Sequence, residues 1–477
     1  MRKTKIIATL GPSTRSIENL ERLIEAGCNV IRINMSHSSR EEADQIMEDV
    51  RTLSDEVAIL VDTKGPEVRT TVAPQPVELK VGSDVVIKGD PQGETNDQQI
   101  CVTYEDLPEA LELGTMILIA DGQMEVKVKS KALTDNALIC EVIRGGTLTS
   151  KKGVNIPGVK LPMPFLSEQD RADITFAARS GADFVAASFV GDVNDVNQVK
   201  DLIASEGGHA KVISKIESQY AIVNLEAIIE ASDGIMVARG DLGVEIPAER
   251  VPVAQKRMIQ ACRAAGRSVI VATEMLESMI HNPRPTRAET SDVANAIFEG
   301  ADAVMLSAET SVGKYPFDAV RMMGRIAEIA EAEFALGQSA PPEVLESDVS
   351  ELICKSAWLA AQDLMLNAIL VPTSSGRTAK RMSRFRPRSV ILATTPDMVI
   401  ARSLALCYGV YALPARHFGR MESMVRRSCQ VMIDAGYLPD NGLIAVAAGV
   451  PVGRSGSTNL LSIQDLAAVT GRMNSED

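Results

Sequence analysis

The chain has 477 residues, a length that corresponds to about three domains at roughly 150 residues each. Hydrophobic residues make up 45% of it and charged residues 23%, which is the composition of a globular protein and excludes extensive disorder. Asp and Glu number 63 against 49 Lys and Arg, and the formal net charge of −14 argues against a general nucleic-acid-binding or anionic-membrane-binding protein.

No segment has the signature of a membrane or secreted protein. Apolar runs stay below the roughly 18 residues that a transmembrane helix needs, and the run 6–10 stops at Gly11-Pro12, too soon for a signal peptide. The seven cysteines are scattered and form no CxxC pair, which favours reduced thiols over disulfides or a zinc site. We therefore expect a cytoplasmic protein with neither a membrane nor a nucleic-acid partner.

Short β-branched runs alternate with amphipathic stretches along the first two thirds of the chain. The eight runs are 4–10, 29–36, 57–64, 183–190, 211–217, 234–241, 268–275 and 302–309. Strands that alternate with helices pair in parallel, and eight such units match a closed (β/α)₈ TIM barrel better than an open doubly wound sheet. We expect this catalytic barrel to comprise residues 1–66 and 164–335.

A segment of different character separates the third run from the fourth. There, short alternating strands are divided by Gly, Asp and Asn turns, which predicts a small antiparallel β-barrel or sandwich over residues 67–163. We expect this insert to act as a lid over the C-terminal mouth of the barrel. After a polar, Pro-containing connector, strand–loop–helix units resume and predict an open α/β domain over residues 336–477.

The chemistry of a TIM barrel lies at the C-terminal ends of its strands, and the expected strand ends here are polar. They carry Arg32, Asn34, Ser36, His37, Asp62, Thr63, Lys64, Lys215, Glu217, Arg239, Gly240, Asp241, Thr273, Glu274, Ser307 and Glu309. Lys215 and Glu217 are two residues apart, so both project from the same face of a strand. Taken alone, these two could form a plain structural ion pair.

Two of these carboxylates point to a metal. Glu217 and Asp241 end adjacent strands with no Cys or His nearby, an oxygen-only pair that suits Mg²⁺ or Mn²⁺ rather than zinc. Arg32 and Lys215 would face that metal, and convergence of Arg, Lys and Mg²⁺ on one point is what phosphoryl transfer requires. The loop 238–241 precedes a helix, so its free N–H groups can hold a carboxylate or phosphate.

A second cluster of oxygen donors comes from the ends of the second and third runs. It comprises Asn34, Ser36, Asp62 and Thr63 and carries only one formal charge. Such a set suits a monovalent cation, and ordinary strand-end capping is the alternative.

Several strings, taken together, resemble the bacterial type of the pyruvate kinase family. They are KIIATLGPS, VIRINMSH, VDTKGPEVRT, KKGVNIPG, ISKIES, IMVARGDLGVE, ATEMLESM, NPRPTRAE and MLSAETSVGKYP. The resemblance implies phosphoryl transfer from phosphoenolpyruvate to ADP, giving pyruvate and ATP in the last step of glycolysis. It also implies dependence on Mg²⁺ (or Mn²⁺) and K⁺, a cytoplasmic homotetramer, and regulation by a phosphorylated effector.

The resemblance further implies individual roles. Lys215 would stabilise the transferring phosphoryl group, Arg32 would bind phosphate, and Glu217 and Asp241 would bind Mg²⁺. The substrate's carboxylate and enolate side would be held by the backbone of Ala238, Arg239 and Gly240 and by Thr273, with Asp241 beside them. The K⁺ would be held by Asn34, Ser36, Asp62 and Thr63. The nucleotide would contact Asn34, His37, Arg69 and Lys152, and a proton relay to the enolate would use Ser307 and Glu309. Glu67 stands where K⁺-dependent members have Glu and K⁺-independent members have Lys, so we expect activation by K⁺.

The C-terminal domain contains a hydroxyl-rich glycine loop before a basic helix: Thr373, Ser374, Ser375, Gly376, Arg377 and Thr378. Its N–H and hydroxyl groups could cradle a phosphate, or the loop could merely cap the helix. The resemblance implies an allosteric effector site here, with the loop 449–459 closing over it. Two other functions stay open: a metal-dependent enolpyruvate aldolase or lyase, which needs no nucleotide, and a non-catalytic metabolite sensor.

Overall fold

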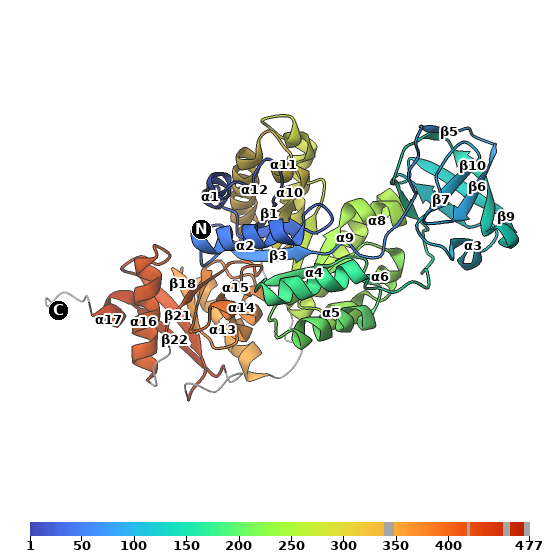
Figure 1. Ribbon diagram of the computed structural model, residues 1–477. Coiled ribbons are helices and arrows are strands. Elements are labelled where there is room, and N and C mark those ends of the chain that lie inside the picture. The colour runs from blue at the N-terminus through green and yellow to red at the C-terminus, as the bar shows by residue number, and fades with distance from the viewer. Residues whose placement is uncertain (338–347, 417–419, 452–457, 472–477) are drawn as a thin grey trace.

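The computed structural model describes residues 1–337, 348–416, 420–451 and 458–471. Its central element is a closed barrel of eight parallel strands in the order β1-β17-β16-β15-β14-β13-β3-β2 (Figure 1). The strands are β1 (Lys5–Thr9), β2 (Val30–Asn34), β3 (Ala58–Asp62), β13 (Phe184–Ala187), β14 (Lys211–Ile216), β15 (Gly234–Ala238), β16 (Ser268–Ala272) and β17 (Ala303–Leu306). Each of the eight runs identified in the sequence contains one of these strands, so the predicted TIM barrel is confirmed.

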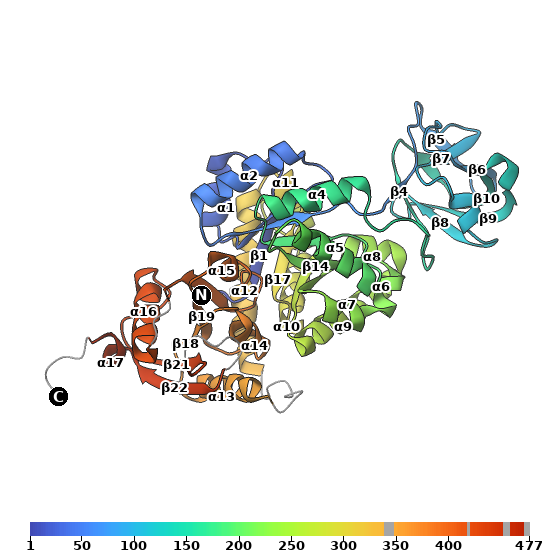
Figure 2. The same ribbon diagram turned by 60° about the horizontal axis from the view of Figure 1, so that its bottom comes forward.

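Helices follow the strands and cover the outside of the barrel (Figure 2). They are α1 (Ile17–Glu25), α2 (Arg40–Leu53), α4 (Glu168–Arg179), α5 (Val193–Ser205), α6 (Gln219–Val223), α7 (Leu225–Ala231), α8 (Arg239–Glu245), η2 (Ala248–Arg250), α9 (Val251–Ala265), η3 (Glu277–Ile280), α10 (Arg287–Glu299), α11 (Ala308–Ser311) and α12 (Pro316–Gly337). A capping box fixes the first turn of α2, α4, α5 and α10. These caps set where each helix begins beyond the C-terminal rim of the barrel.

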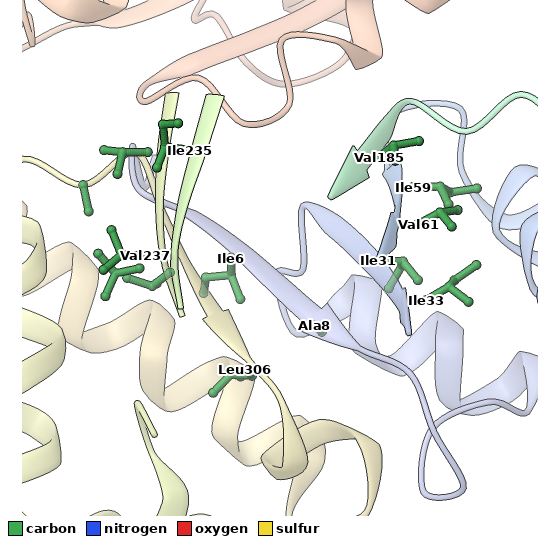
Figure 3. Packing of buried hydrophobic residues seen from close by; sticks show 14 of the residues in the cluster. Ile6, Ala8, Ile31, Ile33, Ile59, Val61, Val185, Ile235, Val237 and Leu306 are labelled. Atoms are coloured by element: carbon green, nitrogen blue, oxygen red, sulfur yellow. The ribbon is translucent and has the colours of Figure 1, made fainter. Parts of the chain in front are cut away.

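Successive side chains of a strand point to opposite faces, and the barrel strands bury both. Ile6, Ala8, Ile31 and Ile33 belong to the apolar layer between strands and helices (Figure 3). The alternate residues form a separate interior cluster, which Leu406 of the C-terminal domain joins. Its strand members are Ile7, Val30, Ala58, Leu60, Phe184, Ala186, Ile213, Met236, Ile270, Ala272, Ala303 and Met305. The barrel interior is therefore a packed core, as in other TIM barrels.

An inserted β domain leaves the barrel after β3 and returns before α4. It contains β4 (Val68–Arg69), β5 (Val77–Leu79), β6 (Asp84–Gly89), β7 (Gln99–Val102), α3 (Leu107–Ala110), β8 (Met116–Ile119), β9 (Met124–Ala132), η1 (Leu133–Asp135), β10 (Ala137–Arg144), β11 (Gly146–Leu148) and β12 (Gly153–Asn155). One sheet has the order β4-β12-β8-β9-β10-β6-β7, and β11 pairs with β5. In Figures 1 and 2 this domain stands out from the barrel beyond α6 and α8.

One pairing departs from the antiparallel arrangement expected for the insert. Strands β6 and β7 pair in parallel, whereas the other pairings of this domain are antiparallel. The physical reason is the segment 90–98, which carries the chain back along β6 so that β7 starts from the same end. The alternation of side chains is the same for both pairings and does not encode this choice.

The C-terminal domain has a five-stranded sheet in the order β20-β19-β18-β21-β22, with β22 antiparallel to its four parallel neighbours. Its elements are α13 (Val349–Asp363), β18 (Ala368–Pro372), α14 (Arg377–Arg384), β19 (Val390–Thr395), α15 (Met398–Arg402), β20 (Val410–Pro414), α16 (Met421–Asp434), β21 (Leu443–Ala448), β22 (Leu460–Asp465) and α17 (Leu466–Thr470). This confirms the predicted open α/β domain. The domain boundaries stay predictions, and the connector beside the last one (residues 338–347) lies outside the described residues.

The C-terminal domain packs against the N-terminal end of the barrel. The N–H of Gly409 donates to the carbonyl of Lys3 (2.8 Å), and the guanidinium of Arg386 contacts the carboxylate of Asp302 (2.9 Å). Leu406 joins the apolar interior of the barrel. The rim with the polar strand ends lies at the other end of the barrel. No helix within the described ranges combines the length and apolarity needed to span a bilayer.

Candidate active site

The inward-facing residues of the barrel strands change from apolar to charged at the C-terminal rim. Arg32 follows Val30 by two residues on β2, and Lys215 follows Ile213 by two on β14, so each charged residue is in register with the interior cluster. Asp62 ends β3 in the same way. The period of two therefore places these charges directly above the apolar interior.

Arg32, Asp62, Lys215 and Glu217 form one buried charge network. Arg32 Nε lies 2.7 Å from Asp62 Oδ2, and Lys215 Nζ lies 2.9 Å from Glu217 Oε1 and 3.3 Å from Asp62 Oδ1. Lys215 also donates to the Ser188 hydroxyl (2.7 Å). The side chains of Arg32 and Lys215 keep only 10% and 12% exposure, respectively, and those of both carboxylates 1%. Two cations and two carboxylates are thus held together at the rim.

The network keeps Lys215 charged. Burial by itself disfavours the ammonium, but the carboxylates of Asp62 and Glu217 outweigh it and raise the pKa of Lys215. Burial likewise disfavours the Asp62 carboxylate, yet Arg32 and Lys215 lower the pKa of Asp62 below its usual value. Lys215 is therefore a cation over the physiological pH range and can bind an anionic group at the rim.

Glu217 differs from Asp62 because another carboxylate lies near it. Burial raises the pKa of Glu217 to about 7, and the charge of Asp241 adds to the rise, against the opposing effect of Lys215. A pair of carboxylates left incompletely neutralised fits a hard divalent cation, which Mg²⁺ sites typically bind with one or two carboxylates plus water and substrate oxygens. In the described part of the chain no three His, Cys, Asp or Glu side chains gather into a metal site. A cation held by Glu217 and Asp241 would therefore need further ligands besides these side-chain types.

The turn after β16 meets the first residues of α8. Thr273 Oγ1 accepts from the N–H of Gly240 (2.9 Å) and donates to the carbonyl of Ala272 (2.7 Å). Ala238, Gly240, Asp241 and Thr273 are therefore brought together as the sequence predicts. A side chain at position 240 would lie 3.6 Å from Thr273 Oγ1, so glycine leaves the backbone open at this point.

The substrate role expected at Arg239 belongs to its backbone, and the structure shows where its side chain lies. Its guanidinium donates to the carbonyls of Ala272 (3.3 Å) and Thr273 (2.6 Å) and pairs with Asp292 of α10 (2.6 Å). These groups lie behind the β16 turn, and only the backbone of Arg239 belongs to the rim. The sequence ARGD does not predict the direction of the Arg239 side chain, since that direction depends on its rotamer.

Ser307 and Glu309 lie together after β17. Glu309 is fully buried, and its two carboxylate oxygens accept from the N–H groups of Leu276 (3.0 Å) and Ser307 (2.7 Å). The Ser307 hydroxyl is buried and has no hydrogen-bond partner within the described residues. Glu309 thus holds the segment after β16 and the segment after β17 together. The Ser307 hydroxyl is left able to bond a group outside the described residues.

The four residues expected to bind K⁺ are only partly gathered. Asn34 pairs with Asp62 in the register of β2 and β3, and its Oδ1 accepts from the N–H of the exposed Ser36 (3.1 Å). Thr63 Oγ1 accepts from the N–H of Ser188 (3.2 Å) and so is bonded to the segment after β13. Asn34 and Asp62 are therefore neighbours in register, but the Asp62 oxygens are paired with Arg32 and Lys215, and Thr63 is engaged elsewhere.

A cavity of about 590 Å³ lies between the inserted domain and the barrel. Arg69 and Lys152 line it from the insert, and Asp241 lines it from the barrel. Arg69 pairs with Glu67 (2.8 Å) and donates to the Lys151 carbonyl (3.0 Å). Asn34 and the exposed His37 do not line this cavity, so the structure brings only two of the four expected nucleotide contacts together.

The sequence and the fold match known proteins over nearly the whole chain. Residues 1–320 match the family described as pyruvate kinase, barrel domain, and residues 351–464 match pyruvate kinase, alpha/beta domain. A pyruvate kinase from Geobacillus stearothermophilus is 43% identical over 475 residues, which is 97% of this chain and 80% of the relative. The chain belongs to the pyruvate kinase family.

Other pyruvate kinases support the same assignment. One from Bacillus licheniformis is 42% identical over 482 residues, covering 99% of this chain and 82% of the relative. A crystal structure of a pyruvate kinase from Cryptosporidium parvum has a TM-score of 0.89 and 37% identity, covering 97% of this chain and 96% of the other. The resemblance found in the sequence is confirmed, and the chain is a pyruvate kinase enzyme by family.

The loop expected to bind an effector of this pyruvate kinase is held by internal hydrogen bonds. Thr373 Oγ1 accepts from the N–H groups of Ser375 (3.4 Å) and Gly376 (3.0 Å), and Gly376 has a φ of 73° at the start of α14. Thr378 Oγ1 lies 2.5 Å from Thr458 Oγ1. Ser374 and Arg377 are exposed. Of the loop 449–459, residues 452–457 lie outside the described residues.

Ser188 is a rim residue that sequence reasoning missed. It follows β13, accepts from Lys215, donates to the carbonyl of Thr63 (2.7 Å) and is buried. The available signal was its place two residues after the inward-facing Ala186, in register with the other rim residues of the pyruvate kinase barrel.

Proposed function

We propose that the rim transfers the phosphoryl group of phosphoenolpyruvate to ADP, with Mg²⁺ held by Glu217 and Asp241. The observation that carries this proposal is the buried network in which Lys215 is kept charged between Asp62 and Glu217. Such a site presents fixed positive charge to an anion without needing to reorganise during the reaction.

Arg32 and Lys215 would bind the phosphate of phosphoenolpyruvate from adjoining walls. As the bond between phosphorus and the enol oxygen breaks and one to a β-phosphate oxygen of ADP forms, charge is spread over three phosphoryl oxygens. Lys215 Nζ would stabilise that charge. Bound Mg²⁺ supplies further charge neutralisation at the phosphate and enolate oxygens. Thr273 and the backbone at 238–240 would hold the carboxylate and enolate side.

The enolate left by transfer needs a proton to become pyruvate. Of the two residues expected to relay this proton, Ser307 and Glu309, Ser307 has a hydroxyl without a partner among the described residues. Both oxygens of Glu309 accept from backbone N–H groups. In this proposal Ser307 passes the proton, and Glu309 holds the loop that carries Ser307.

We also propose activation by K⁺ at Asn34, Ser36, Asp62 and Thr63. The support for this site is that Asn34 and Asp62 pair in the register of β2 and β3, so a neutral and a charged oxygen donor lie at adjacent strand ends. At position 67 a carboxylate pairs with Arg69 (2.8 Å), so no ammonium group stands there to supply the positive charge in place of K⁺.

The inserted domain would bind the nucleotide through Arg69 and Lys152 and close over the barrel, excluding water from the phosphoryl group. His37 and Asn34 would contact the nucleotide from the barrel side only in a more closed arrangement, because neither lines the present cavity. We further propose a cytoplasmic homotetramer regulated by a phosphorylated effector at residues 373–378. The seven buried, unpaired cysteines fit a reducing compartment.

The test is pyruvate release from phosphoenolpyruvate, ADP and Mg²⁺, coupled to NADH oxidation, with K⁺ or with Na⁺ alone. We expect turnover with K⁺ and, for Lys215→Met, a loss of about 10²–10³-fold, the typical cost of removing one such preorganised group. Equal rates in Na⁺ and K⁺ would contradict the K⁺ site. Pyruvate release that needs no ADP would favour the lyase reading instead.

A further inference from the structure

The turn after β16 is held in an unfavourable conformation. Thr273 and Glu274 have φ values of 66° and 54°, and two consecutive non-glycine residues thus occupy the left-handed region. This region is unfavourable for an L-residue because it brings Cβ too close to the following carbonyl oxygen. Such backbone persists only where surrounding contacts determine it, and these sites cluster where ligands bind. The contacts that hold this turn are therefore informative.

The Arg239 side chain supplies most of them. Its guanidinium bonds the carbonyls of Ala272 and Thr273, at 3.3 and 2.6 Å, and contacts Met275 Sδ at 2.9 Å. Three groups of the turn, at residues 272, 273 and 275, are thus tied to one rigid, planar group. Asp292, in the middle of α10, holds the remaining side of the guanidinium at 2.6 Å.

We propose that Arg239 and Asp292 are positioning residues that hold Thr273 and the backbone of Gly240 in the geometry that binds the substrate's carboxylate and enolate side. The inference rests on the proposed role of Thr273. Arg239 acts from behind the turn, and Thr273 Oγ1 then meets the N–H of Gly240 at 2.9 Å. Position 239 follows the strand end directly, so the same short segment supplies both the substrate-facing backbone and the group that braces it.

The pair also connects the rim to the outside of the barrel. The Asp292 side chain is 36% exposed, whereas that of Arg239 is 12% exposed. A change on the surface of α10 can therefore reach Thr273 through a single ion pair. Substrate affinity should be sensitive to Asp292 although this residue does not touch the substrate.

The test compares Asp292→Asn, Arg239→Met, the double variant and Thr273→Val. We expect kcat/KM for phosphoenolpyruvate to fall about tenfold or more in Asp292→Asn and further in Arg239→Met, because misplacing a binding group by 1 Å can cost about 10²-fold. The KM for ADP should change less than about twofold. The double variant should be no worse than Arg239→Met, since the two residues act as one unit. Asp318→Asn, which breaks the exposed Arg321–Asp318 pair (2.8 Å) on α12, is the matched control and should leave kinetics unchanged.

Three results would overturn the inference, and they are distinguishable. If Thr273→Val impairs phosphoenolpyruvate binding but Asp292→Asn does not, the positioning role fails while the proposed function stands. If Thr273→Val itself leaves kcat/KM for phosphoenolpyruvate unchanged, the proposed role of Thr273 fails and the inference fails with it. If Asp292→Asn and Arg239→Met lowered kcat/KM equally for phosphoenolpyruvate and ADP and also lowered the thermal midpoint, the two residues would have a general structural role. This result would also contradict the proposal.

Discussion

Lys215 depends on three oxygen-bearing neighbours for its position. Asp62 and Glu217 supply the charge, whereas the Ser188 hydroxyl, at 2.7 Å, supplies a directional contact. Carboxylates attract an ammonium over a broad range of angles, but a hydroxyl whose own proton is donated to the Thr63 carbonyl accepts from a narrower direction. The Ser188 hydroxyl therefore orients the Lys215 ammonium within the charge network.

Replacing Ser188 by Ala should lower kcat about tenfold and destabilise the fold by about 1 kcal/mol, the usual effect of one hydrogen bond. The KM for phosphoenolpyruvate should change little, because the charge of Lys215 is retained. Ser214→Ala is a matched control: Ser214 is the preceding residue of β14, is fully buried, and bonds Ser232 (2.6 Å) on the other face of the strand. A loss of kcat as large in Ser214→Ala as in Ser188→Ala would refute a specific role for Ser188.

Single residues also show how far the sequence could lead. The period of two along each strand was enough to predict Arg32, Asp62 and Lys215 at one rim, because parallel strands end together. Ser188 escaped notice because one serine in an apolar run carries little signal. The direction of the Arg239 side chain could not be predicted at all, since it depends on rotamers and on Asp292, 53 positions further along the chain.

At the scale of elements, Asp302 joins three segments at the N-terminal end of the barrel. It directly precedes β17, and its Oδ2 accepts from the N–H of Val269 at the start of β16 (3.0 Å). Its Oδ1 accepts from Arg386 (2.9 Å) and from the N–H of Tyr408 (3.1 Å), both in the C-terminal domain. The side chains of Arg386 and Asp302 are only 2% and 8% exposed, respectively. One carboxylate therefore connects two barrel strands to the neighbouring domain.

Replacing Asp302 by Ala should destabilise the protein by about 3–5 kcal/mol, because it leaves the Arg386 charge buried without its partner. The double variant Asp302→Ala with Arg386→Met should recover part of that loss. Denaturant unfolding measures both, with Asp318→Asn as an exposed-pair control expected to change stability by less than about 1 kcal/mol. An Asp302→Ala variant as stable as the parent chain would show that this pair does not contribute to domain docking.

Strand direction was the element-level feature that the sequence left undetermined. The eight barrel strands could be predicted as parallel because helices lie between them. In the insert, β6 and β7 are joined by an irregular segment that is compatible with either direction, and the segment 90–98 decides it by crossing back along β6. The geometry of this connection, and not the composition of the strands, therefore determines that β6 and β7 pair in parallel.

At the scale of the whole molecule, the proposed catalytic site and the contact with the C-terminal domain occupy opposite ends of the same strands. The C-terminal ends carry the charge network, whereas the N-terminal ends contact the C-terminal domain through Lys5, Asp302 and Leu406. Any signal from the effector loop would therefore have to reach the rim along the barrel strands or through a neighbouring subunit. The sequence predicted the three domains but not this arrangement, because it arises from contacts between residues such as Lys5 and Val410 that are 405 positions apart.

Lys5 gives the interface between the two domains a pH dependence that can be measured. Its Nζ donates to the Val410 carbonyl (2.5 Å) and lies 3.9 Å from the centre of the Tyr411 ring. Burial, with a further contribution from the charge of Arg2, lowers the pKa of Lys5 from 10.5 to about 7. Between these two values the unfolded chain binds more protons at this residue than the folded chain does. Stability should therefore rise with pH through this window, by about 1 kcal/mol per unit from this group.

The measurement is the denaturant midpoint between pH 7.5 and 9.5, followed by the fluorescence of Trp358, the single tryptophan, which is buried in α13 of the C-terminal domain. Lys5→Met should reduce the rise of stability with pH. Its stability relative to the parent chain should be greatest at the acidic end of this range, because there the parent must either bury the charged ammonium or release its proton on folding. Lys129→Met, at an exposed site paired with Asp84, should leave the slope unchanged. If the slope of Lys5→Met equalled that of the parent, Lys5 would be charged in both states, and the contact with Tyr411 would have to be read as a cation–π interaction that offsets the cost of burial.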